Sequence, residues 1–286
     1  MSGRERTLPE ARPLRFDLAA PADPILARRR MQQICHALRT QGDTTFEEIS
    51  NVVPWLETCE DIGVDVNGEQ VCKPRLFKTH AWRPHLKHTS KEAKYILITR
   101  DPVDSAISFY NFLNGWFFKK DTISIDTFLT QFFLKRGKPA TIMNNPSYWE
   151  FLLSWWPHRK DENVLWLWYE DMKENHREVV VRVADFLGFD SGDSDLVDLV
   201  TSLSTFDYMK KNERHFDEHT WKERNNVRCG LEATASMETS KVMNGGRKPK
   251  PKLSAELVDL LHQKWRDVVT PQTGMNDYEE LRASFP

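Results

Sequence analysis

Residues 95–104 read Tyr-Ile-Leu-Ile-Thr-Arg-Asp-Pro-Val-Asp, and this stretch decides the fold class. Its first half is a continuous apolar run, which is typical of a strand buried on both faces of a parallel sheet. Its second half is typical of a helix start: Asp101 suits the N-cap, Pro102 suits the first helical position, and Asp104 places an acid in the first turn. A strand followed directly by a helix is the building unit of an α/β fold.

Further segments extend this pattern in both directions. Arg75 to His80 and Val164 to Tyr169 are apolar runs bounded by polar residues, and we expect both to be strands. Helical spacing of apolar residues predicts helices from Met31 to about Gly42, from Asn175 to Leu187, and from Ser254 onward. Strands that alternate with helices predict an α/β domain of three layers, with a central, mostly parallel sheet flanked by helices.

We expect residues 1–286 to form one domain. Residues 1–30 are rich in Arg and Pro and have no clear period, so we interpret them as a poorly ordered arm with at most a short strand in Leu14 to Leu18. The stretch Lys241 to Lys252 is rich in glycine, proline and lysine, and is expected to be a loop.

Composition limits the functions that need to be considered. The chain has 40 basic and 42 acidic side chains, and this near-neutral balance gives no reason to expect nucleic acid or an anionic membrane as a partner. No apolar stretch approaches the roughly 20 residues of a membrane helix, and the N-terminus has no secretion signal, so we expect a cytoplasmic protein. The four cysteines show no CxxC spacing, which favours reduced thiols over disulfides or a zinc site.

The glycine positions exclude one common nucleotide-binding device near the N-terminus. No glycine lies between Gly3 and Gly42. A phosphate-binding loop needs glycine immediately before a helix. The first forty residues therefore hold no ordinary phosphate loop.

Polar side chains follow each expected strand. The first strand ends in Lys78-Thr79-His80, the second in Arg100-Asp101 and the third in Tyr169-Glu170-Asp171. Ligands of open parallel sheets bind outside the carboxyl ends of the strands. Cations there would hold phosphate-like oxygens, and a histidine could take a proton from a hydroxyl nucleophile. Polar residues also commonly end strands without any function, so this pattern alone leaves a structural role open.

The residues of these segments, in their order and spacing, resemble the cytosolic sulfotransferase family from about Met31 to Phe285. The resemblance rests on Lys78-Thr79-His80, on Arg100-Asp101-Pro102 followed by Ser108-Phe109-Tyr110, and on residues 169–174. It implies a sulfotransferase fold, similar to that of P-loop NTPases. It also implies transfer of a sulfuryl group from 3′-phosphoadenosine 5′-phosphosulfate, as co-substrate, to a small alcohol, phenol or amine, without a metal.

The resemblance also implies roles for individual residues. His80 matches the general base, and Lys78 matches the cation near the transferring group. Arg100 and Ser108 match the pair that grips the 3′-phosphate. The positions expected to contact the adenine are Tyr169, Ser204, Thr205 and Phe206.

Two segments depart from the family pattern. Where the family has a phosphate loop reading approximately Tyr-Pro-Lys-Ser-Gly-Thr-Thr-Trp, residues 23–30 read Asp-Pro-Ile-Leu-Ala-Arg-Arg-Arg. We interpret Arg28 to Arg30 as a solvated basic stretch, with binding of an anion as the alternative. Where the family has Arg-Lys-Gly to close over the 3′-phosphate, the cations are Arg247 and Lys248, placed after two glycines. The family's dimerisation motif is not recognisable, so the oligomeric state stays open.

Two other interpretations compete with an active sulfotransferase. One is a catalytically impaired or truncated sulfotransferase-like protein, because the phosphate loop is missing. The other is a zinc hydrolase, since His215-Phe216-Asp217-Glu218-His219 fits an H-x-x-E-H pattern in which both histidines bind zinc and Glu218 is the base. Trp82 and residues 116–118 are aromatic and suggest an apolar acceptor pocket, although such residues are more often core.

Overall fold

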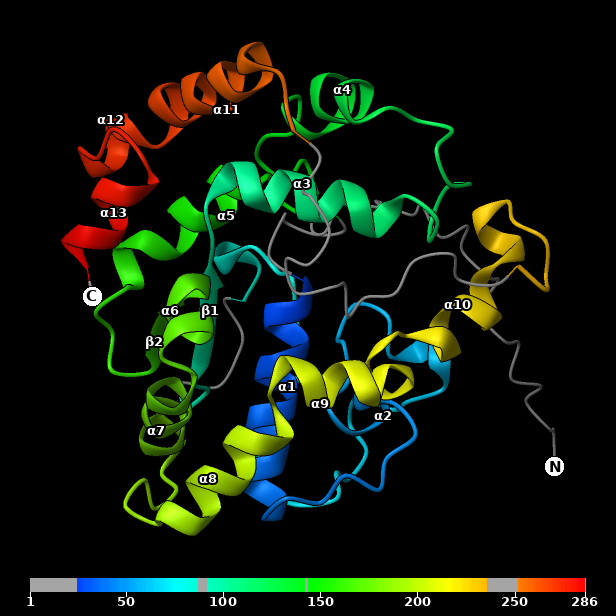
Figure 1. Ribbon diagram of the computed structural model, residues 1–286, viewed down its shortest axis with the longest axis vertical. Helices are drawn as coiled ribbons and strands as arrows, with labels where there is room; N and C mark the ends of the chain where they lie inside the picture. Colours follow the sequence, from blue (N-terminus) through cyan, green and yellow to red (C-terminus); the bar gives the residue numbers. More distant parts are fainter. Residues whose placement is uncertain (1–24, 87–91, 142–143, 236–251, 286) are drawn as a thin grey trace, which may run out of the picture.

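The computed structural model describes residues 25–86, 92–141, 144–235 and 252–285 (Figure 1). Within these residues, two short strands lie among many helices. The strands are β1 (Tyr95–Thr99) and β2 (Val164–Trp168). The α-helices are α1 (Ile25–Thr40), α2 (Ile49–Val52), α3 (Pro102–Leu113), α4 (Ile125–Phe128), α5 (Tyr148–Trp155), α6 (Tyr169–Glu174), α7 (His176–Leu187), α8 (Ser194–Leu203), α9 (Phe206–Lys211), α10 (His219–Asn225), α11 (Ala255–Val268), α12 (Thr270–Thr273) and α13 (Tyr278–Ser284).

Short turns of other helix types complete the list. They are η1 (Glu60–Ile62), η2 (Arg83–Leu86), the π-helical η3 (Leu129–Phe133), η4 (Trp156–His158), η5 (Glu213–Phe216) and η6 (Val227–Cys229). Within the described ranges, no helix is long and apolar enough to cross a membrane.

The two strands β1 and β2 form a parallel pair, as predicted. Their register joins Tyr95 to Val164 and Thr99 to Trp168. The prediction of a strand at residues 75–80 is wrong. That segment makes an isolated bridge in which Lys78 pairs with Trp55. Its apolar run is too short to fill a buried strand, because it holds Leu76 and Phe77 alone between charged neighbours.

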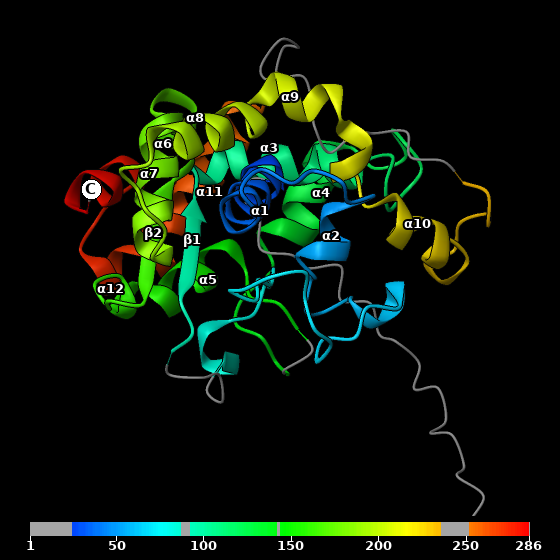
Figure 2. The ribbon, with the colours of Figure 1, turned by 90° about the horizontal axis from the view of Figure 1, so that it is seen from below.

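The strand pair lies between two layers of helices, which gives the predicted three-layer α/β arrangement. On one face, Leu97 and Trp166 pack with buried side chains of α3, α5 and α11. On the other face, Ile98 and Leu167 pack with α1, α7 and α8. Figure 1 shows the first group of helices in its upper half and the second in its lower half. Figure 2 shows β1 and β2 side by side, with α7 next to β2.

Three expected helices form with the predicted ends. Asp101 caps α3 by accepting hydrogen bonds from the backbone N–H groups of Val103 and Asp104. Gly188 ends α7 with φ 85, a left-handed conformation that glycine adopts without steric cost. Ser254 caps α11, whose Leu257, Leu261 and Trp265 are buried. Leu260, next to the buried Leu261, is 41% exposed.

Helix α1 departs from the prediction at its start. It begins at Ile25, so residues 25–30 are helical and belong to the folded domain instead of a poorly ordered arm. Arg29 and Arg30 are 1% and 7% exposed, and the interpretation of this stretch as solvated is therefore wrong. The short strand proposed at residues 14–18 lies outside the described residues.

Candidate active site

Arg100 and Tyr169, which follow β1 and β2, lie against each other. The guanidinium carbon of Arg100 is 4.3 Å from the centre of the Tyr169 ring. The reason is the strand register, because Thr99 and Trp168 are paired and the next residue of each strand extends to the same edge. A guanidinium on an aromatic face is a favourable cation–π contact. The parallel pairing of β1 and β2 therefore brings these two predicted site residues together.

The helix that follows β1 orients Arg100. Its guanidinium Nη2 lies 2.8 Å from a carboxylate oxygen of Asp104, in the first turn of α3. Ser108 is half-buried one turn further along α3, on the side of the helix that carries Asp104. The face of α3 that follows Arg100 thus presents a carboxylate and then a hydroxyl.

Lys78 and His80 form a second group, around Trp55 and outside the sheet. The Lys78 Nζ atom is 3.9 Å from the centre of the Trp55 ring, and the rings of Trp55 and His80 are 4.6 Å apart. The carboxylate of Glu57 accepts hydrogen bonds from the His80 backbone N–H at 2.6 Å and from the Thr79 hydroxyl at 2.7 Å. His80 is buried, so its position is set by Trp55 on one side and by the anchored backbone on the other.

Glu218 lies beside Lys78 and joins it to the start of α1. Its carboxylate is 3.0 Å from the Lys78 Nζ atom and also forms an ion pair with the guanidinium of Arg29. Arg29 further donates to the Gln32 side chain and to the Ser50 hydroxyl, at 2.8 and 3.2 Å. Burial lowers the pKa of Arg29 to about 10, so the guanidinium remains charged at neutral pH.

Arg30, the next residue of α1, reaches α6, the helix that begins at Tyr169. It donates a hydrogen bond to the backbone carbonyl of Met172 in α6 at 2.8 Å. Burial lowers its pKa, and the nearby Tyr169 opposes this effect. Burial, followed by the charge of Arg30, lowers the pKa of His176 to about 4. His176 Nε2 lies 3.0 Å from the Ser204 hydroxyl, which links Ser204 to the same side of the site.

The other residues expected to contact adenine are occupied at helix ends. The Ser204 hydroxyl also donates to the backbone carbonyl of Val200 at 2.6 Å. The Thr205 hydroxyl caps α9 by accepting from the Tyr208 backbone N–H. Phe206 packs on a separate hydrophobic cluster with Phe46 and Phe216 among its members. Arg247 and Lys248 lie outside the described residues, so their contact with a phosphate stays a prediction.

The geometry around His215 and His219 does not match the zinc hydrolase pattern. His215 lies in η5, His219 begins α10, and Glu218 between them has φ 59, so the two histidines do not share one helix face. Glu218 points into the ion pair with Lys78 instead. The ring of His215 makes an edge-to-face contact with Phe46, with 5.4 Å between centres.

His219 itself belongs to a cluster with Glu48 and Asp217, whose ligand atoms lie within 4.8 Å of one another. Burial opposes a charge on His219, but its hydrogen bond to Asp217 and the carboxylates of Asp217 and Glu48 outweigh burial and raise its pKa. The hydrogen bond between the imidazole and Asp217, with the Glu48 carboxylate nearby, accounts for this cluster as an internal polar network.

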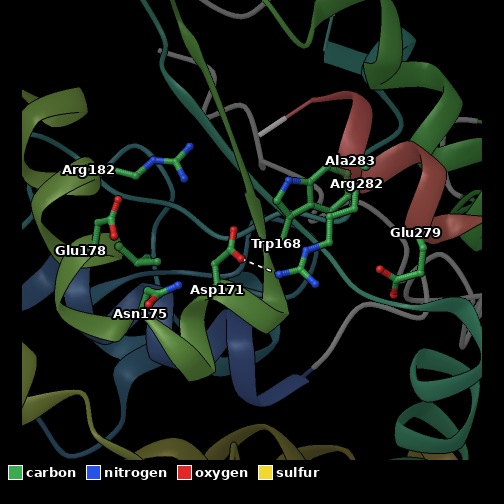
Figure 3. Close-up of a pocket in the computed structure, with 9 residues that line it drawn as sticks. Trp168, Asp171, Asn175, Glu178, Arg182, Glu279, Arg282 and Ala283 are labelled. Atoms are coloured by element: carbon green, nitrogen blue, oxygen red, sulfur yellow. Dashed lines mark hydrogen bonds and ion pairs between the residues drawn. The ribbon is translucent and has the colours of Figure 1, made fainter.

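A surface cavity of about 450 Å³ lies on the far side of β2, between α6, α7 and α13 (Figure 3). Asp171 and Arg282 form an ion pair across it at 2.8 Å. None of the predicted site residues lines it. Among the aromatic residues proposed for an acceptor pocket, Trp116 is stacked on Trp221 and buried in a small core cluster, so it has a structural role.

No motif spacing marks Glu57. The H-x-x-E-H pattern marks Glu218, but as the base of a zinc site and not as the partner of Lys78 and Arg29. Arg29 was noticed but taken as solvated, and the signal that could have corrected this is the continuation of the apolar helical period of α1 through Ala27 and Met31, both buried.

Comparisons with known proteins identify the family of the chain. A family model described as the sulfotransferase domain matches residues 28–268. Sulfotransferase 1E1 of Cavia porcellus is 31% identical over 213 residues, which cover 71% of this chain and 68% of the relative. Sulfotransferase 2A1 of Rattus norvegicus is 30% identical over 203 residues, covering 69% and 68%.

Solved structures are similar in fold at lower identity. A retinol dehydratase in complex with androsterone and the inactive cofactor PAP has a TM-score of 0.60 and 16% identity, covering 86% of this chain and 78% of that one. Mouse sulfotransferase SULT7A1, complexed with PAP, has a TM-score of 0.59 and 18% identity, covering 88% and 84%. The family model spans most of the chain and includes both groups of site residues, and the chain therefore belongs to the sulfotransferase family.

Proposed function

We propose that this protein transfers a sulfuryl group from 3′-phosphoadenosine 5′-phosphosulfate to a hydroxyl or amine of a small acceptor. The observation that carries the proposal is the contact of Arg100 with Tyr169 at the strand ends, inside a matched sulfotransferase domain. Buried or half-buried cations on both sides of α1 fit an anionic nucleotide, because charge-assisted hydrogen bonds to phosphate need such groups.

We assign the nucleotide half of the site to the Tyr169 side of α1. Arg100 and Ser108 would bind the 3′-phosphate, with Arg247 and Lys248 closing over it. Tyr169 and the segment 204–206 would contact the adenine. Ser204 lies 3.0 Å from His176, on which the charge of Arg30 acts, and this contact supports the grouping for Ser204.

We assign the transfer half to the Lys78 side. His80 would accept the proton of the acceptor hydroxyl or amine, and the Lys78 ammonium would neutralise charge that develops on the leaving group. The bound co-substrate supplies the sulfuryl group, whose bond to phosphate breaks as the bond to the acceptor forms. Glu57 holds the His80 backbone, which fixes the base before the reaction and avoids the cost of ordering it later.

The acceptor class is proposed from the proton transfer assigned to His80 and from the ligands of solved relatives. The solved relatives include complexes with androsterone and with retinol. We extend to this chain the class of small acceptors that carry a hydroxyl or an amine, and we place the reaction in the cytoplasm.

Two measurements test the proposal separately. Calorimetry with 3′-phosphoadenosine 5′-phosphate (PAP) measures nucleotide binding, and transfer of labelled sulfate to a panel of alcohols, phenols and amines measures activity. We expect saturable binding and transfer to at least one acceptor class. Absence of PAP binding would overturn the nucleotide assignment, while binding without transfer to any acceptor would leave a nucleotide-binding protein that is not a sulfotransferase.

A further inference from the structure

Glu218 is a buried carboxylate held between two cations of the site. Its side chain is 3% exposed, and the side chains of Arg29 and Lys78 that it contacts are 1% and 9% exposed. Two converging cations with little solvent around them are the arrangement that phosphate or sulfonate oxygens require. In this chain, a carboxylate of the protein fills that position.

Arg29 comes from the segment that precedes the rest of α1 and reaches the same carboxylate as Lys78. By the resemblance in sequence, residues 23–30 are expected to take the place of the family's phosphate loop, and they hold no lysine and no glycine. Arg29 nevertheless brings a guanidinium from this segment to the side of Lys78, through their shared contact with Glu218. A cation from the loop segment and a cation from the Lys78 segment thus meet at one point.

We propose that Arg29 and Lys78 form the binding pair for the anionic 5′ end of the donor, and that Glu218 occupies this pair until the donor displaces it. The inference rests on the proposed function and adds to it a binding residue and an internal competitor. Arg29 compensates for the missing loop, and Glu218 keeps two buried cations paired while no donor is bound. Such pairing is needed because an unpartnered buried charge is strongly destabilising.

The first test measures PAP affinity by calorimetry for Glu218→Gln, which keeps the shape but removes the competing charge. We expect binding to tighten by about tenfold or more, since one charged competitor is removed. Glu213→Gln, five residues earlier in η5 and paired at the surface with Lys210, is the matched control and is expected to leave the affinity unchanged. In the Glu218→Gln background, adding Arg29→Met should weaken binding by about tenfold or more. Unchanged or weaker binding for Glu218→Gln would overturn the inference.

A second test uses inorganic sulfate as the probe and is independent of the adenine half. We expect sulfate to raise the melting temperature of Glu218→Gln more than that of the wild type or of Glu213→Gln. If no variant binds PAP but sulfate shows this difference, the proposed function fails and the anion pair stands. If the wild type binds PAP and sulfate shows no difference, the anion pair fails and the proposed function stands. Should Glu218→Gln not fold, Glu218→Asp, which keeps the charge but shortens its reach, should give a smaller gain in the same direction, and no gain would count against the inference.

Discussion

The guanidinium of Arg100 lies over the ring of Tyr169, with 4.3 Å from its carbon to the ring centre. Neither residue is in a strand, yet each directly follows one, and the paired ends of β1 and β2 deliver both to the same place. The contact depends on the strand register, because a shift of one residue would turn one of the two side chains to the opposite face of the sheet.

Replacing Arg100 by Met should weaken PAP binding by about 10- to 100-fold, because it removes a charge-assisted contact to phosphate. Calorimetry gives the affinity directly. Arg177→Met is the matched control, since Arg177 is half-exposed and paired at the surface with Asp198. Equal affinities for the two variants would contradict the assignment of Arg100.

Replacing His80 by Ala should reduce sulfuryl transfer by about 100-fold or more while PAP affinity changes little, because a general base acts on the acceptor and not on the nucleotide. The two quantities are measured on the same preparation by a transfer assay and by calorimetry. His158→Ala, at an exposed position beside Asp161, should retain both. A large loss of PAP binding in His80→Ala would instead indicate a structural role.

Acid should destabilise the protein through His36. Burial, assisted by the Arg39 charge, lowers the pKa of His36 from 6.5 to about 4, so the unfolded chain binds a proton between these values and the folded chain does not. The free energy of unfolding therefore falls as the pH drops from about 6.5 to about 4, by about 3 kcal/mol from this residue. Denaturant unfolding at pH 7 and pH 4.5 should show a smaller acid loss for His36→Gln than for the wild type. His158→Gln, at the surface, should keep the wild-type acid loss.

Adjacent leucines of α11 should differ in their contribution to stability. Leu261 is fully buried in the core shared with Trp265, whereas Leu260 is 41% exposed. Leu261→Ala should lower the free energy of unfolding by about 2–5 kcal/mol, and Leu260→Ala by less than about 1 kcal/mol. Urea denaturation of both variants measures the difference. Similar losses would mean that α11 packs in another orientation.

The fold class could be predicted from β1, β2 and the capped helices, because continuous apolar runs and cap residues are local signals. The strand prediction at residues 75–80 is wrong because its apolar run is too short, whereas the bridge that Lys78 makes with Trp55 depends on contacts distant in sequence. For the same reason, the resemblance to the family marks Lys78 and His80 but not Trp55 or Glu57 around them, and the motif that contains Glu218 does not indicate its contact with Lys78. Arg29 was misjudged because charge suggests solvent, while its burial depends on a carboxylate far along the chain.

The neighbouring arginines of α1 have a mechanical consequence. Successive residues of an α-helix point about 100° apart, so Arg29 can reach Glu218 while Arg30 reaches the backbone of α6. Both guanidiniums extend from the same turn of one helix. A rotation of α1 about its own axis would therefore move both, and it would change the surroundings of Lys78 and of Tyr169 together.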